Sequence, residues 1–260
     1  MKFAGGLIIA FSMYSRIPMP RIAWTRERME YALCFFPLVG AVMGTALWGF
    51  GLFCRRMGLE GSLFYAAAGT ALPIGITGGI HMDGFLDVTD ARASWGERQQ
   101  KLEILKDPHI GAFAAVGCGV YLLCYLAAFS LLPADRLPAV GAVYVITRAL
   151  SAWAVVSAPK AKPDGLAAAF SKDAKKRTAG LAAVGYLAVS FWFLARTAGM
   201  PEVFVTAALA AGWFFKYLHM AKKEFGGVTG DLAGYYLQTS ELLLLVGLAG
   251  AHLWQTGGWI

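Results

Sequence analysis

Long apolar runs alternate with short polar links along the whole chain. Seven runs approach the roughly 20 residues that a helix needs to cross a bilayer, and they cover 31–53, 63–80, 110–132, 138–157, 180–198, 202–219 and 232–254. A shorter apolar run at 3–13 predicts a partial or interfacial helix. No polar stretch is long enough to form a separate soluble domain. The pattern therefore predicts an all-α, polytopic membrane helix bundle, a single integral membrane domain over residues 1–260.

The composition agrees with lipid as the solvent. Hydrophobic residues make up 58% of the chain and charged residues only 15%, whereas soluble domains carry about 25% charged residues. The four cysteines lie in or beside apolar runs and form no CxxC pair. We therefore expect them to pack as small hydrophobic residues, not to bind metal or form disulfides.

The basic residues are sorted between two sets of links. With seven spans, the links at 14–30, 81–109, 158–179 and 220–231 must share one face, and those at 54–62, 133–137 and 199–201 the other. The first set carries sixteen Lys and Arg residues and the second, counted with Arg196 at its edge, carries four. The positive-inside rule then places the first set in the cytoplasm, so we expect a multi-pass membrane protein whose long links face the cytoplasm.

The net charge of +7 is explained by these links. It favours contact with anionic lipid headgroups or an anionic substrate. Nucleic acid is not expected as a partner, because the chain has no basic helix and no nucleic-acid fold signature. A homo-oligomer is compatible with the sequence.

Three aspartates follow the second apolar run directly. Asp83, Asp87 and Asp90 are spaced to lie on one face of a helix, where their charges repel one another. A divalent cation would remove that repulsion, and Mg²⁺ prefers carboxylate and phosphate oxygens. The same segment carries His81, whose ordinary pKa suits a general base. The alternative is a solvated acidic helix face.

Two further links carry candidate chemistry. Glu103 and Asp107 are four residues apart on the same link as the aspartates, with Lys106 between them. Either of the two acids could be a further metal ligand or a base, and Lys106 could contact phosphate. The alternative is an ordinary i, i+4 pattern at the start of a helix. Gly227, Thr229 and Asp231 follow the pattern of a glycine-rich turn that brings backbone N–H groups to an anion at a helix N-terminus. The alternative for this turn is a simple N-cap.

Two arginines complete the set of candidates. Arg148 lies about midway along a predicted span, so its charge must either pair with an acid in the membrane or hold a phosphate. Arg16 stands beside two prolines in the first link, where it either contacts phosphate or forms part of a stiff surface turn.

With these residues identified, the chain resembles the cobalamin synthase family of adenosylcobinamide-GDP ribazoletransferases. Six motifs appear in the family's order, at 15–20, 36–40, 77–90, 102–113, 148 and 226–241. The acidic motif at 77–90 is the most specific. The chain departs from the usual family pattern at 85–86, at Ala91, at 108–109 and at Gln238, but the three signature aspartates are present.

The resemblance implies a reaction and a set of roles. Adenosylcobinamide-GDP and α-ribazole, or its 5′-phosphate, would be the substrates, adenosylcobalamin or its phosphate and GMP the products, and Mg²⁺ the cofactor. Metal ligands are expected at Asp83, Asp87, Asp90 and Asp231. Catalytic roles are expected among Asp83, Asp87, Asp107, Glu103 and His81, and substrate contacts at Arg16, Lys106, Arg148, Gly227 and Thr229.

Two other classes of membrane protein remain open at this stage. An alcohol phosphotransferase of phospholipid synthesis also clusters aspartates at a cytoplasmic face. Asp90-Ala91-Arg92 echoes part of its motif, but the later aspartate pair is absent. A cation-coupled transporter would place its acids at the membrane midplane and show internal repeats, and neither feature is evident.

Overall fold

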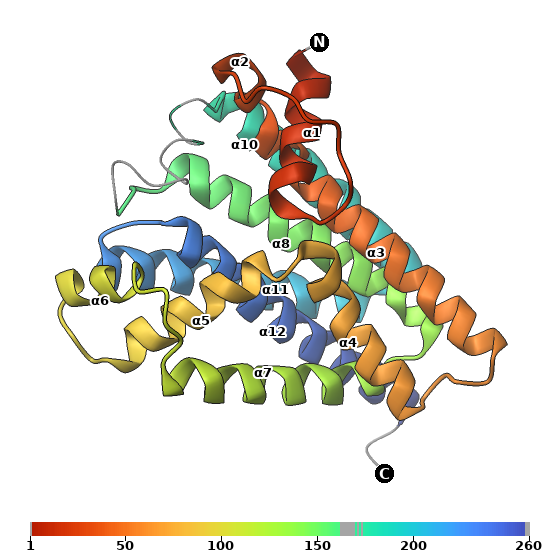
Figure 1. Cartoon of the computed structure of the whole chain (residues 1–260). Coiled ribbons are helices and arrows are strands. Elements are labelled where there is room, and N and C mark those ends of the chain that lie inside the picture. The colour runs from red at the N-terminus through yellow and green to blue at the C-terminus, as the bar shows by residue number, and fades with distance from the viewer. Residues whose placement is uncertain (1, 162–169, 171, 173, 258–260) are drawn as a thin grey trace.

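The computed structural model describes residues 2–161, 170, 172 and 174–257 and builds them from helices (Figure 1). The elements are α1 (Lys2–Tyr14), α2 (Arg26–Met29), α3 (Ala32–Arg56), α4 (Leu63–Thr77), α5 (Ile80–Ala93), α6 (Arg98–Ile104), α7 (Ala112–Ser130), η1 (Ala134–Arg136), α8 (Leu137–Ser157), α10 (Lys176–Thr197), α11 (Met200–Met220), η2 (Ala221–Phe225) and α12 (Gly230–Thr256). The all-α prediction is confirmed. In the predicted link at 158–179, residues 162–169, 171 and 173 lie outside the described residues.

Among the described residues, six helices are long and apolar enough to cross a membrane: α3, α7, α8 with η1, α10, α11 with η2, and α12. They correspond to six of the seven predicted spans. The partial helix predicted at 3–13 is α1, whose 13 residues rise about 20 Å at 1.5 Å each. That length is less than the roughly 30 Å of a hydrocarbon core.

The seventh predicted span, 63–80, is not one straight helix. Its residues form α4 and the first residue of α5, and the axes of α4 and α5 differ by 96°. Gly78 and Gly79 lie between them with φ of 65° and 81°, a backbone conformation that suits glycine. The side chain of Arg16 packs against Gly78, and its backbone N–H donates to the carbonyl of Ile76 at 2.7 Å. The first link therefore covers the outside of this elbow.

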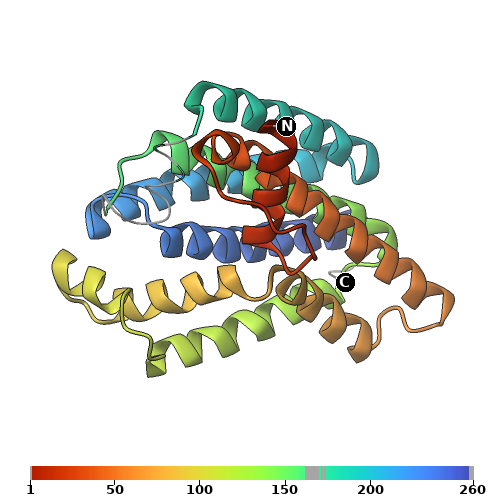
Figure 2. The same ribbon diagram turned by 45° about the horizontal axis from the view of Figure 1, so that its top comes forward.

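Helix α8 lies at the centre of the bundle, against α3, α10 and α12 (Figures 1 and 2). Its crossing with α3 is very close: a Cβ atom added to Gly44 would lie 2.4 Å from the Cα atom of Gly141, and one added to Gly40 would lie 2.5 Å from the carbonyl oxygen of Tyr144. Small residues at such crossings let two membrane helices gain van der Waals contact along their backbones.

The core of the bundle contains an ion pair. Arg148 of α8 is fully buried, and its Nη1 atom lies 2.7 Å from Oε1 of Glu241 in α12, whose side chain is 3% exposed. The same nitrogen donates to the carbonyl of Tyr144 at 3.1 Å. An unpaired cation at this depth would be costly, so the pair ties α8 to α12. Of the two sequence alternatives, pairing with a membrane acid is the one observed.

A substitution at the α3–α8 crossing tests its contribution to stability. Gly44→Ala should destabilise the protein by about 1–3 kcal/mol, because the added methyl group meets backbone and not a movable side chain. Gly49→Ala on the same helix is the matched control, since nothing lies within 4 Å of its added Cβ atom. Thermal unfolding in detergent measures both, and equal transition temperatures for the two variants would contradict the proposed close crossing.

The buried ion pair makes a second prediction. Glu241→Gln should destabilise the protein by about 3–5 kcal/mol, because it leaves the Arg148 charge buried without a counter-charge. Replacing both partners, with Arg148→Met and Glu241→Leu, should recover most of that loss. The comparison variant is Glu27→Gln, which breaks an exposed pair with Lys2 and should change little. Unfolding of Glu241→Gln at the wild-type temperature would refute the assignment.

Candidate functional site

The candidate site forms where α5 packs against α12. A Cβ atom on Gly84 would lie 2.6 Å from the carbonyl oxygen of Asp231, and one on Gly234 would lie 3.0 Å from the carbonyl oxygen of His81. The rings of Phe85 and Tyr235 stack beside this contact, with centroids 5.9 Å apart. Because no side chain separates the two backbones, the first turn of α12 lies directly beside the acidic face of α5.

Four carboxylates meet at this junction. Asp87 is half-buried, and the charges of Asp83, Asp90 and Asp231 all act on it. Asp83 is exposed, while the partly buried Asp231 lies in the first turn of α12, where the helix dipole favours a negative charge. The α5 aspartates and Asp231 are therefore near enough for their like charges to act on one another.

Asp90 has a second function. Its Oδ2 atom accepts a hydrogen bond from the backbone N–H of Gly111 at 2.6 Å, and Oδ1 accepts one from Ala114 at 2.8 Å. Both oxygens thus cap the N-terminus of α7, whose first N–H groups have no partner within the helix. Asp90 is the least available of the four carboxylates for a metal ion.

The donor set suits magnesium, although it does not form a closed cage. Among the described residues, no three His, Cys, Asp or Glu side chains converge tightly enough to hold a metal by themselves. Mg²⁺ usually takes only one or two carboxylates from the protein and fills its remaining positions with water and substrate phosphate. One or two carboxylates from Asp83, Asp87 and Asp231 would fit that mode of binding.

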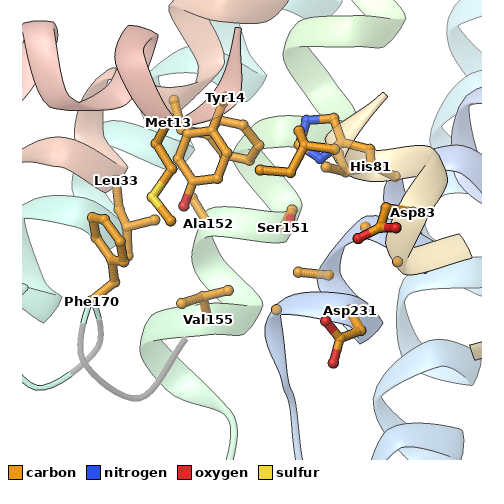
Figure 3. A pocket seen from close by; sticks show the side chains of 17 residues that line it. Met13, Tyr14, Leu33, His81, Asp83, Ser151, Ala152, Val155, Phe170 and Asp231 are labelled. Carbon is orange, nitrogen blue, oxygen red and sulfur yellow. The ribbon is translucent and has the colours of Figure 1, made fainter. Parts of the chain in front are cut away.

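A cavity of about 270 Å³ opens beside Asp83 and Asp231. It lies between α1, α3, α5, α8 and α12, and Figure 3 shows side chains from these helices pointing into it. Asp83 and Asp231 form one end of the cavity, and Met13, Leu33 and Phe170 form the other. The acidic junction is therefore one wall of a larger, mostly apolar site.

His81 lines the same cavity. It is 4% exposed, and its Nε2 atom has no hydrogen-bond partner among the described residues. Its ring lies 6.0 Å from that of Tyr14 and 5.9 Å from that of Phe36, measured between centroids. A buried polar atom without a partner is uncommon, and this nitrogen belongs to a residue that lines the cavity.

The candidates on the α6–α7 link lie elsewhere. Glu103, Lys106 and Asp107 are exposed and are not among the described residues that line the cavity. The carboxylate of Asp107 accepts hydrogen bonds from the backbone N–H of His109 at 3.0 Å and from its ring at 2.7 Å. These bonds hold the pKa of Asp107 below its usual value. A carboxylate with a lowered pKa is a weaker base, so Asp107 is a poor candidate for the general base.

The glycine-rich turn has a structural role that the sequence left open. Thr229 is the N-cap of α12, and its hydroxyl accepts the N–H of Leu232 at 3.1 Å. Gly227, with φ of 155°, packs against the backbone at 159–161, where the N–H of Val228 donates to the carbonyl of Pro159 at 2.8 Å. The N-cap alternative is confirmed, and the turn joins two of the predicted cytoplasmic links.

One group of charged residues was missed by the sequence analysis. Glu224 accepts from Lys101 at 2.8 Å and from Arg92 at 3.3 Å, and Arg92 also donates to the hydroxyl of Tyr235 at 2.8 Å. This network joins α5, α6, η2 and α12 beside the aspartates. Only the high density of basic residues in these links pointed to it, and that density does not say which acid each cation meets.

Comparison with known proteins gives the chain a family. The profile of the family described as Cobalamin-5-phosphate synthase matches residues 6–249. A protein of Lachnoclostridium phytofermentans named adenosylcobinamide-GDP ribazoletransferase is 41% identical and covers 100% of both chains. Proteins of the same name from Geobacillus kaustophilus, covering 92% of this chain and 93% of the relative, and from Desulfitobacterium hafniense, covering 93% and 95%, are each 32% identical.

No solved structure matches this chain, so its assignment depends on the sequence comparisons. The family match covers nearly the whole chain and includes α5, most of α12 and the residues that line the cavity. This chain belongs to the cobalamin-5-phosphate synthase family.

Proposed function

We propose that this chain joins adenosylcobinamide-GDP to α-ribazole or its 5′-phosphate and releases GMP, at a magnesium site formed by α5 and α12. The names of the relatives support the reaction. The observation that carries the proposal is that Asp83 of α5 and Asp231 of α12 line the same cavity, while the charges of both act on Asp87. Such a wall would collect divalent cations and, through them, the charge of a pyrophosphate.

The reaction is a phosphoryl transfer. A ribose hydroxyl of ribazole forms a new bond to the phosphorus attached to cobinamide, and the bond from that phosphorus to the GMP oxygen breaks. The hydroxyl proton must leave as the new bond forms. The protein must hold two large substrates in line and offset the charge of the transferred group.

Magnesium bound by Asp83, Asp87 and Asp231 would neutralise the pyrophosphate of the GDP substrate. Asp90 would hold the start of α7 in place and contribute to the same field. Asp83 faces both the cavity and solvent, so it lies where the two substrates would meet. The number of ions is left open by the donor set.

His81 is the residue best placed to take the hydroxyl proton. It lines the cavity two residues before Asp83, and its Nε2 atom has no hydrogen-bond partner in the described part of the chain. Glu103 and Asp107 remain candidates only if the α6–α7 link approaches the substrate. Arg16, at the α4–α5 elbow, and Lys106 would contact phosphate from the surface. Arg148 would act indirectly, through its bond to Glu241, by fixing α12 against α8.

The active-site links are proposed to face the cytoplasm of a bacterial cell, with lipid around α3, α7 and α10–α12. The supporting observation is the excess of basic residues on the links that surround the site. This orientation would bring the site to the side where nucleotide substrates are found.

Loss of one aspartate tests the proposed chemistry. Asp83→Ala should lower GMP release from cobinamide-GDP and α-ribazole at least a thousandfold, because a metal ligand is removed, while thermal stability stays close to wild type. Chelation by EDTA should stop the wild-type reaction and added Mg²⁺ should restore it. Asp135→Asn, an exposed aspartate in the α7–α8 connection, is the control. Near-normal turnover by Asp83→Ala, or turnover in EDTA, would contradict the metal proposal.

Cysteine labelling tests the orientation. In a background where the four native cysteines are replaced, Gln99→Cys on α6 and Arg56→Cys at the end of α3 each place one thiol on an exposed position. A membrane-impermeant maleimide added to spheroplasts should label the cysteine at position 56 at once. It should label position 99 only after the membrane is opened. The reverse order would overturn the orientation.

A further inference from the structure

The cavity beside α5 has two chemically different ends. Figure 3 shows Asp83 and Asp231 on one side, and Met13, Leu33 and Phe170 on the other, with Val155 of α8 between them. The apolar end has no charged side chain among its described lining residues. A ligand that fills this cavity must therefore combine an apolar part with a part that tolerates carboxylates or a metal ion.

Aromatic rings surround the apolar end. The ring centroids of Tyr14 and Phe36 are 4.1 Å apart, those of Tyr14 and His81 are 6.0 Å apart, and those of Tyr14 and Phe170 are 6.4 Å apart. Aromatic rings pack well against other flat rings in offset or edge-to-face arrangements. The apolar end is thus suited to a flat, hydrophobic ring system.

The cavity is too small for the corrin ring of adenosylcobinamide-GDP. Its volume of about 270 Å³ corresponds to about nine waters at roughly 30 Å³ each. That space holds a bicyclic base and part of a ribose. It is several times too small for a corrin ring with its side chains, which must remain outside.

The remaining flat rings of the two substrates are the adenine and guanine of adenosylcobinamide-GDP and the benzimidazole of ribazole, and their edges differ. Adenine and guanine carry donors and acceptors around the six-membered ring, and burying these groups without partners is costly. The benzimidazole of ribazole carries methyl groups on the corresponding edge and needs no such partners. The apolar residues Met13, Leu33 and Val155 therefore favour the benzimidazole.

We infer that this cavity is the subsite for the ribazole substrate, with its benzimidazole among Tyr14, Phe36 and Phe170 and its ribose toward His81, Asp83 and Asp231. In this orientation the ribose lies beside His81, whose Nε2 atom has no hydrogen-bond partner among the described residues. The inference deepens the proposed function and rests on it. Adenosylcobinamide-GDP would then approach the aspartates from the side of the cytoplasmic links.

Two alanines of α8 provide a matched test. Ala152 is 1% exposed and lines this cavity, whereas Ala142 is 4% exposed and lines a separate apolar groove between α3, α8 and α10. Ala152→Leu should raise the KM for ribazole about tenfold or more, because it occupies the space of the base. The KM for cobinamide-GDP should change less than about twofold. Ala142→Leu should leave both KM values near wild type. Ala152→Val serves if the leucine variant does not fold.

Ligand binding without turnover separates this inference from the proposed reaction. Wild-type protein in nanodiscs, without Mg²⁺ and without cobinamide-GDP, should bind α-ribazole saturably, and GDP should not displace it. Ala152→Leu should weaken this binding and Ala142→Leu should not. Displacement by GDP, a rise only in the KM for cobinamide-GDP, or no effect of Ala152→Leu on either KM would overturn the subsite. Absence of GMP release by the wild type would instead overturn the proposed function, whatever the cavity binds.

Discussion

The close approach of α5 and α12 is the contact on which the site depends. Gly84 and Gly234 place no side chain between the two helices, so the aspartates of α5 lie near Asp231. This arrangement works against folding, because like charges repel most strongly where burial limits the access of water. The packing of the apolar bundle must offset that repulsion when no cation is present. A cation bound at the proposed site would then add stability as well as chemistry.

Charged residues in the core of the bundle have different surroundings from those at the ends of the helices. In the core, Arg148 has a partner, Glu241, and the two together are nearly inaccessible to solvent. At the ends of the helices, carboxylates are left facing a cavity, and cations such as Arg92 and Lys101 are held near them by Glu224. The deep arginine therefore supports the scaffold, and the contacts to a charged substrate fall to residues on the links. A buried charge with a dedicated partner is a poor substrate contact, because using it would leave that partner unpaired.

Much of this architecture could be predicted from the sequence. Long apolar runs set six spans, and the i, i+4, i+7 spacing placed the three aspartates on one helix. The elbow at Gly78 and Gly79 was missed because the apolar run continues through it and only the backbone angles reveal the break. The cavity was missed for a different reason. Its walls come from five helices far apart in the chain, and no local pattern records which apolar faces leave a space between them.

Asp90 caps the N-terminus of α7, so one short acidic motif contains both a residue that the fold needs and residues proposed to act on the substrate. Asp83 and Asp90 look equivalent as letters in a repeating acidic pattern, yet the carboxylate of Asp90 is committed to two backbone N–H groups. Losing Asp90 would leave two N–H groups at the start of α7 without their acceptor. If Asp83 serves turnover as proposed, two neighbouring aspartates of one motif are needed for unrelated reasons, one for the reaction and one for the fold.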